Sequence, residues 1–208
     1  VLSVGAIYTV GPYLFPRLVP GINQLAPEMP MYLEENYTAD LRVKLSSGAL
    51  DAIFVALPFT EPEVVTRSLF DEPFVVMMPR DHSMAKQSTI APTALAEHKV
   101  LLMGEGHCFR DQVLEACPGL QESIVAHNAR DHTVVEGSSL DTLKHMVASG
   151  MGITVLPESA ANIALYSEHD LVVRPFQEPS PYRTIALAWR VSYPRPQVID
   201  LLVEALKD

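Results

Sequence analysis

The sequence predicts an α/β fold in which strands and helices alternate along the chain. Short runs of β-branched and apolar residues recur at intervals, and stretches with apolar residues at helical spacing lie between them. Start and stop signals for helices flank several of these stretches. Such alternation is typical of largely buried sheets covered by helices. The predicted strands are residues 2–7, 31–33, 51–57, 74–78, 100–103, 153–156, 171–173 and 184–191.

Residues 10–23 are expected to form the first helix. Apolar residues recur there every four positions, which defines one buried helix face. Pro12 suits the first helical turn, whereas Pro16 would lie inside the helix and should kink or shorten it. The residues of the apolar face are Leu14, Leu18 and Ile22.

Three further helices are predicted, and two of them have recognisable signals at their ends. Residues 39–47 should end at Gly48, since glycine commonly closes helices. Another helix should close at Gly150, and it opens at hydroxyl and carboxylate side chains that favour a helix N-terminus. Those opening residues are Ser138, Ser139 and Asp141. Residues 196–207 carry an apolar stripe that is expected to pack against the rest of the protein.

The composition indicates a globular protein with an acidic charge balance. The 208 residues include 15 Lys and Arg against 25 Asp and Glu, for a formal net charge of −10. A chain of this charge has no basic field to neutralise a phosphate backbone, so it should not hold DNA by itself. Its apolar runs are far shorter than the roughly 20 residues that span a bilayer, and no signal-peptide pattern opens it. We therefore expect no membrane partner.

The segment 104–118 carries the most informative pattern. A glycine turn precedes a helix that should end near Cys117, because Pro118 disfavours helical geometry at the residue before it. Cys108 then lies in the first helical turn, where unpaired backbone N–H groups favour a thiolate. The sequence has only two cysteines, which argues against a disulfide scaffold. We therefore expect the protein to be located in the reducing cytoplasm.

Cys117 is expected to behave differently from Cys108. It shares the apolar face of the same helix with Phe109 and Val113, as a small buried residue does. Nine helical steps separate the two cysteine Cα atoms by roughly 13 Å and place the side chains on opposite faces. A disulfide needs Cα atoms about 4.4–6.8 Å apart, so this bond would require the helix to unwind. Such a bond would be a switch.

Two plainer interpretations stand beside this one. From spacing alone, the cysteines are two unrelated buried thiols, since free cysteine commonly acts as a small hydrophobe. A zinc site is less favoured, because paired close spacing is missing and only His107 lies beside the cysteines. We expect no metal and no cofactor.

Residues 106–112 read Gly-His-Cys-Phe-Arg-Asp-Gln, and Cys117 follows Cys108 by nine positions. This segment resembles the redox segment of the peroxide-sensing members of the LysR-type transcriptional regulators. The resemblance covers nearly the whole chain and includes two elements generic to the effector domains of that family. These are Gly-x-Leu-Asp at residues 48–51 and Gly-x-Gly-Ile-x-x-Leu-Pro at residues 150–157.

The resemblance implies a two-lobed fold like that of type 2 periplasmic binding proteins, each lobe a mixed sheet flanked by helices. Lobe I would be residues 1–75 with 178–208, and lobe II, with the cysteines, residues 76–177. The family's N-terminal winged helix-turn-helix domain is absent from this chain. Contacts with DNA and RNA polymerase would therefore be made only by the full-length protein, a homodimer or homotetramer.

The resemblance also implies roles for single residues. Cys108 would be the peroxidatic residue that hydrogen peroxide oxidises to a sulfenic acid, and Cys117 the resolving residue that forms the disulfide. The refolded segment would switch the oligomer to activate antioxidant genes, and glutaredoxin or thioredoxin would reduce it again. The implied residues of the peroxide pocket are Thr9, Thr38, His107, Arg110, Asp111 and Arg183.

Two rival functions remain open. A metabolite-binding LysR-type effector domain, or a solute-binding protein, would use the cleft between the lobes, because a fold does not fix a function. A thiol peroxidase is less favoured, since slow reduction of a protein-bound disulfide makes a switch and not a catalyst. We therefore expect a regulator without enzymatic activity, and the cysteine pair distinguishes it from its rivals.

Overall fold

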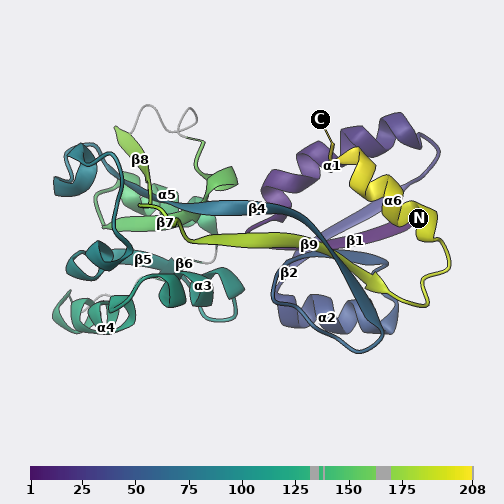
Figure 1. Ribbon diagram of the computed structural model, residues 1–208, viewed down its shortest axis with the longest axis horizontal. Coiled ribbons are helices and arrows are strands. Elements are labelled where there is room, and N and C mark those ends of the chain that lie inside the picture. The colour runs from purple at the N-terminus through teal and green to yellow at the C-terminus, as the bar shows by residue number, and fades with distance from the viewer. Residues whose placement is uncertain (132–135, 138, 163–169, 208) are drawn as a thin grey trace. The chain divides into compact units, whose positions relative to one another are not determined.

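The computed structural model describes residues 1–131, 136–137, 139–162 and 170–207, and the chain divides into two compact units (Figure 1). Unit 1 is Val1–Asp71 with Thr184–Asp208, and unit 2 is Glu72–Arg183. The chain thus passes between the units twice, at 71/72 and 183/184. The lobe boundaries expected from the sequence were 75/76 and 177/178, a few residues away. Both passages fall in long strands, β4 (Val64–Pro79) and β9 (Tyr182–Arg190).

Unit 1 is built on a mixed sheet with the strand order β2–β1–β3–β9. β1 pairs in parallel with β2 and β3, and β3 pairs antiparallel with β9. Helix α1 packs on α6, and α2 packs on β1 and β3. The elements are β1 (Leu2–Ile7), α1 (Gly11–Leu25), β2 (Met31–Asn36), α2 (Thr38–Ser47), β3 (Ala52–Ala56) and α6 (Pro196–Ala205).

Unit 2 has a second mixed sheet, in the order β4–β7–β5–β6, with β8 also paired to β4. β5 is parallel to β6 and β7, whereas β4 is antiparallel to β7 and β8. Its strands and helices are β5 (Val100–Met103), α3 (Cys108–Ala116), α4 (Leu120–Asp131), β6 (Glu136–Gly137), α5 (Leu140–Ala148), β7 (Ile153–Pro157) and β8 (Leu171–Pro175). The described residues of this unit also form the 3₁₀ helices η1 (Ser83–Lys86), η2 (Pro92–Glu97) and η3 (Glu158–Ala160). The predicted α/β fold, with mixed sheets flanked by helices, is confirmed.

The helix end signals act as the sequence predicted. Gly48 closes α2 with a left-handed φ of 82°, and Gly150 follows α5 with a φ of 78°. At the start of α5, the Ser139 hydroxyl accepts a hydrogen bond from the Thr142 N–H at 3.1 Å. The expected opening residue Ser138 lies outside the described residues.

Pro16 was predicted to kink or shorten the first helix, and the shortening is wrong. α1 continues through Pro16 and Pro20 to Leu25. A proline inside a helix costs a hydrogen bond, but the apolar face of α1 is fully engaged and outweighs that loss. The buried residues of this face are Leu14, Leu18 and Ile22.

The close packing of α1 on α6 gives a testable prediction at Gly21. A Cβ atom there would meet the backbone oxygen of Ala205 and lie 2.9 Å from its Cα. We expect Gly21→Ala to destabilise the protein by about 1–3 kcal/mol, as overpacking does. Urea denaturation measures the effect, with Asn23→Ala on the exposed face of α1 as the matched control. A stabilising Gly21→Ala, as helix propensity alone favours, would contradict this close approach.

Candidate functional site

Helix α3 places Cys108 at its first position. The chain turns at Gly106, whose φ of 93° lies in the left-handed region, and His107 is the N-cap residue of the helix. The Cys108 side chain is partly exposed and its sulfur is free. Cys108 therefore lies at a helix N-terminus, as the sequence predicted.

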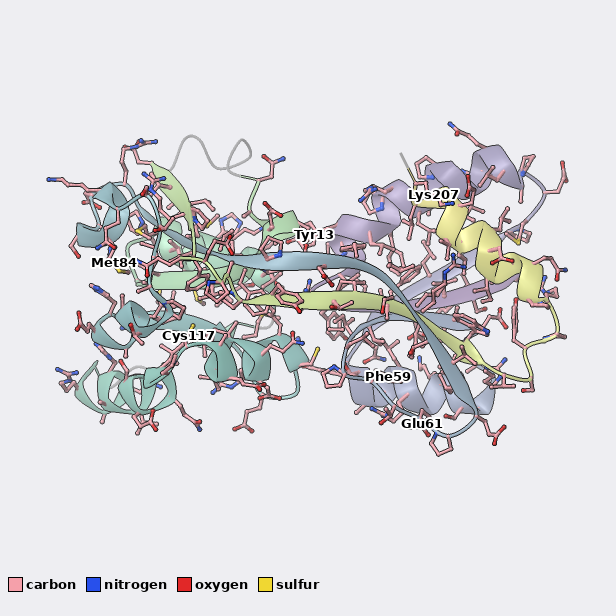
Figure 2. The ribbon with its side chains drawn as sticks, viewed as in Figure 1. Tyr13, Phe59, Glu61, Met84, Cys117 and Lys207 are labelled. Atoms are coloured by element: carbon pink, nitrogen blue, oxygen red, sulfur yellow. The ribbon has the colours of Figure 1, made fainter. Side chains whose placement is uncertain are left out.

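Cys117 ends the same helix and is buried. Only 1% of the residue is exposed, and its N–H donates to the carbonyl oxygen of Val113 at 3.1 Å. Burial raises the pKa of the Cys117 thiol to about 12, so it remains a thiol near neutral pH. Figure 2 labels Cys117 in unit 2. The predicted helix end at Cys117 and the buried place of its sulfur are both confirmed.

The two sulfurs belong to opposite ends of an intact helix. α3 spans Cys108–Ala116, and both cysteines are free. Nine helical steps give a Cα separation of roughly 13 Å, about twice the reach of a disulfide. A bond between Cys108 and Cys117 therefore requires α3 to open.

His107 is buried beside Cys108, with 6% of the residue exposed. Burial lowers the pKa of its imidazole below the ordinary value of 6.5. The imidazole is consequently neutral near pH 7 and adds no net positive charge beside Cys108.

This buried imidazole gives a pH prediction. The pKa of His107 is lower in the folded than in the unfolded protein, so the unfolded chain binds protons more readily as the pH falls below about 6.5. Lowering the pH from about 7.5 to about 5.5 should lower the free energy of unfolding of the wild type. In His107→Gln this decrease should be smaller. Denaturation of both proteins at both pH values measures this. Burial also lowers the pKa of His82, but this residue is present in both proteins, so its contribution cancels in the comparison. An equal pH dependence of the free energy of unfolding in the wild type and in His107→Gln would contradict the prediction.

Arg110 and Asp111 lie on the first turns of α3. The Arg110 guanidinium donates from Nη1 to the carbonyl oxygen of Met103 at 2.8 Å, which ties α3 to the end of β5. Asp111 is exposed. Both residues line an open groove along α3, together with Glu105, Gly106, Leu114, Glu115 and Gln121. Arg110 thus brings a permanent positive charge to the helix of Cys108.

Arg183 is buried in the same unit and approaches the neighbour of Cys108. Its Nε donates to Oε1 of Glu72 at 2.9 Å, and its guanidinium carbon lies 5.3 Å from the centre of the Phe109 ring. Because Phe109 follows Cys108 directly, Arg183 is packed against the first turn of α3. Sequence reasoning had named Arg183 but missed Glu72 and Phe109 as its partners.

Thr9 and Thr38 both belong to unit 1. Thr9 is buried and follows β1, and Thr38 is the first residue of α2, just after β2. Because β1 and β2 are parallel neighbours with Ile7 opposite Asn36, both threonines lie beyond the same edge of the sheet. The carboxyl edge of parallel strands is a common place for ligand binding.

The described residues contain no group of three or more His, Cys, Asp or Glu side chains that is placed to hold a metal ion. In the same part of the chain, no helix is both long and apolar enough to cross a membrane.

Comparison with known proteins assigns the family. Residues 1–208 match the family model described as the LysR substrate binding domain. The chain is 37% identical over 207 residues to the DNA-binding transcriptional dual regulator OxyR of Escherichia coli K12. The matched residues cover 99% of this chain and 65% of that protein. The chain therefore spans about 65% of the length of this curated relative.

Two solved structures agree with this assignment. The reduced OxyR regulatory domain of Pseudomonas aeruginosa is 53% identical, with a TM-score of 0.88 over 99% of this chain and 96% of that one. A crystal structure of the oxidised form of OxyR is 36% identical, with a TM-score of 0.81 over 99% of this chain and 93% of that one. The chain is thus similar to OxyR regulatory domains and belongs to the LysR substrate-binding domain family.

Proposed function

We propose that this chain is the sensing domain of a transcription activator that responds to hydrogen peroxide. The observation that carries the proposal is the pair of free cysteines on α3, one partly exposed at its first residue and one buried at its end. Curated relatives named hydrogen peroxide-inducible genes activator support it. The contacts with DNA and RNA polymerase are proposed for the whole protein, which we expect to act in the cytoplasm as a homodimer or homotetramer.

The proposed chemistry has two steps. The Cys108 thiolate attacks one peroxide oxygen and breaks the O–O bond, which gives a sulfenic acid and releases hydroxide that takes up a proton to become water. Cys117 then attacks the sulfenic sulfur, so that a disulfide forms and a second water leaves. Two electrons pass in total from the two thiols to one peroxide. Glutaredoxin or thioredoxin is the proposed reductant, which makes the domain a switch and not an enzyme.

The proposed peroxide pocket uses the remaining residues. The neutral His107 imidazole would donate to or accept from peroxide beside Cys108, and the Arg110 guanidinium would donate to it. Asp111 would orient the Arg110 guanidinium. Thr9 and Thr38 belong to unit 1, and the resemblance alone assigns their hydroxyls to peroxide. Arg183 would act on the first turn of α3 through its contact with the Phe109 ring.

Counting free thiols tests the proposal directly. One equivalent of hydrogen peroxide should convert two free thiols into none, and digestion without reductant should yield one peptide pair linked through Cys108 and Cys117. Two unreacted thiols would overturn the proposal. That result would favour the alternative of a metabolite-binding effector domain, which the edge position of Thr9 and Thr38 in unit 1 supports.

A further inference from the structure

Glu72 and Arg183, the first and last residues of unit 2 in sequence, form a buried ion pair beside α3. The side chain of Arg183 is 0% exposed and that of Glu72 is 6% exposed. Arg183 Nε donates to Oε1 of Glu72 at 2.9 Å, and Arg183 Nη2 forms an ion pair with the same oxygen at 2.9 Å. Removing one member of such a pair leaves a buried charge uncompensated, so each residue fixes the geometry of the other.

The second oxygen of Glu72 is also engaged. Its Oε2 accepts a hydrogen bond from the N–H of Ser159, in η3, at 3.0 Å. Glu72 is on β4 and Arg183 is on β9, so the carboxylate joins three separate parts of unit 2. The Arg183 guanidinium is therefore held in a fixed position.

The redox helix rests on this fixed guanidinium. The Phe109 ring centre lies 5.3 Å from the Arg183 guanidinium carbon, within the range of a cation–π contact. The same ring meets Phe74 edge to face, with ring centres 5.1 Å apart. Phe109 is 2% exposed and is the residue after Cys108. The first turn of α3 is thus anchored through one aromatic side chain.

We propose that Glu72 is a positioning residue for the redox switch: it holds Arg183 against Phe109 and so stabilises the helix that keeps Cys108 and Cys117 apart. This inference rests on the proposed function, because the competing state is the disulfide with α3 opened. When α3 opens at Cys108, the adjacent Phe109 leaves the guanidinium, whereas Glu72 and Arg183 keep each other. Weakening the anchor therefore favours the disulfide.

The midpoint potential of the full 208-residue chain tests the proposal. The protein is equilibrated with glutathione and its disulfide, in which two glutathione thiols become one disulfide as the protein disulfide becomes two thiols. For Glu72→Gln we expect the equilibrium constant for forming the protein disulfide to rise about tenfold, which is a potential lower by about 30 mV. A role in general stability would affect both redox states alike and leave the potential unchanged.

Two further variants complete the test. Glu97→Gln removes the same charge at an exposed position of unit 2 and should leave the potential as in the wild type. Phe109→Leu keeps an apolar side chain but loses the ring, and it should shift the potential in the same direction as Glu72→Gln. If Glu72 acts through Arg183 on Phe109, the double variant should show less than the sum of the two single shifts.

The outcomes separate the two proposals. If the wild type forms the disulfide and both variants keep its potential, the role of Glu72 is overturned and the proposed function stands. Fully additive shifts would likewise contradict action through Phe109. If Glu72→Gln does not fold, the potential of Phe109→Leu decides alone. A wild type that forms no disulfide overturns the proposed function and this inference with it.

Discussion

Replacing Cys108 by Ser should abolish the reaction with stoichiometric peroxide. Cys117 would remain as the only thiol, and with a pKa of about 12 only roughly one molecule in 100,000 carries a thiolate at pH 7. Because the thiolate is the nucleophile, we expect the oxidation rate to fall by more than about a hundredfold. Stopped-flow or quenched thiol titration measures this rate.

The wild type under the same peroxide dose is the reference for the Cys108→Ser variant. The free energy of unfolding should change little, since Cys108 is partly exposed at the start of α3. A folded Cys108→Ser protein that still consumes one equivalent of peroxide at the wild-type rate would move the sensing role to another residue.

Replacing Cys117 by Ala should separate the two chemical steps. Ala avoids the buried, unpaired hydroxyl that Ser would introduce at a site only 1% exposed. Cys108 should still react with peroxide at close to the wild-type rate, but its sulfenic acid cannot be resolved within the chain. We expect a persistent sulfenic acid that dimedone traps in nearly every molecule.

Mass spectrometry of the dimedone adduct measures that intermediate. In the wild type the adduct should be scarce, because Cys117 consumes the sulfenic acid. Equal trapping in the wild type and in Cys117→Ala would show that Cys117 does not resolve the intermediate, and the proposed second step would fail.

The sequence predicted the elements that have strong local signals. The glycine turn before Cys108 and Pro118 after Cys117 bracket α3 in the structure as they do in the sequence. The apolar spacing of α1 and the glycine after α2 are equally local, and both elements are confirmed. Such signals work because they act through the backbone of neighbouring residues.

Two of the elements that were missed are long and lack a local signal. The first half of β4, residues 64–73, contains charged residues and a proline and is mostly exposed, so it resembles a loop in sequence. Helix α4 (Leu120–Asp131) was not predicted because its sequence is polar and shows only a weak apolar face. Tertiary pairing and contact with η2 determine these elements.

The candidate site divides in the same way. The cysteines and their flanking residues lie within one stretch of chain, so the spacing predicted their places on α3. The partners of Arg183 were beyond reach, since Glu72 precedes it by 111 residues. Nothing in the sequence around Glu72 distinguishes a buried carboxylate from an exposed one, and only the fold brings it to Arg183.

Amide hydrogen exchange across α3, in the dithiol and disulfide forms, tests the central claim most directly. The claim is that joining Cys108 to Cys117 opens the helix between them, and the Cys117 N–H bonded to Val113 reports on it. After mass-verified oxidation, the amides of α3 should lose protection while those of α6 in unit 1 keep theirs. Unchanged protection across α3 in a protein with the verified disulfide would contradict the account.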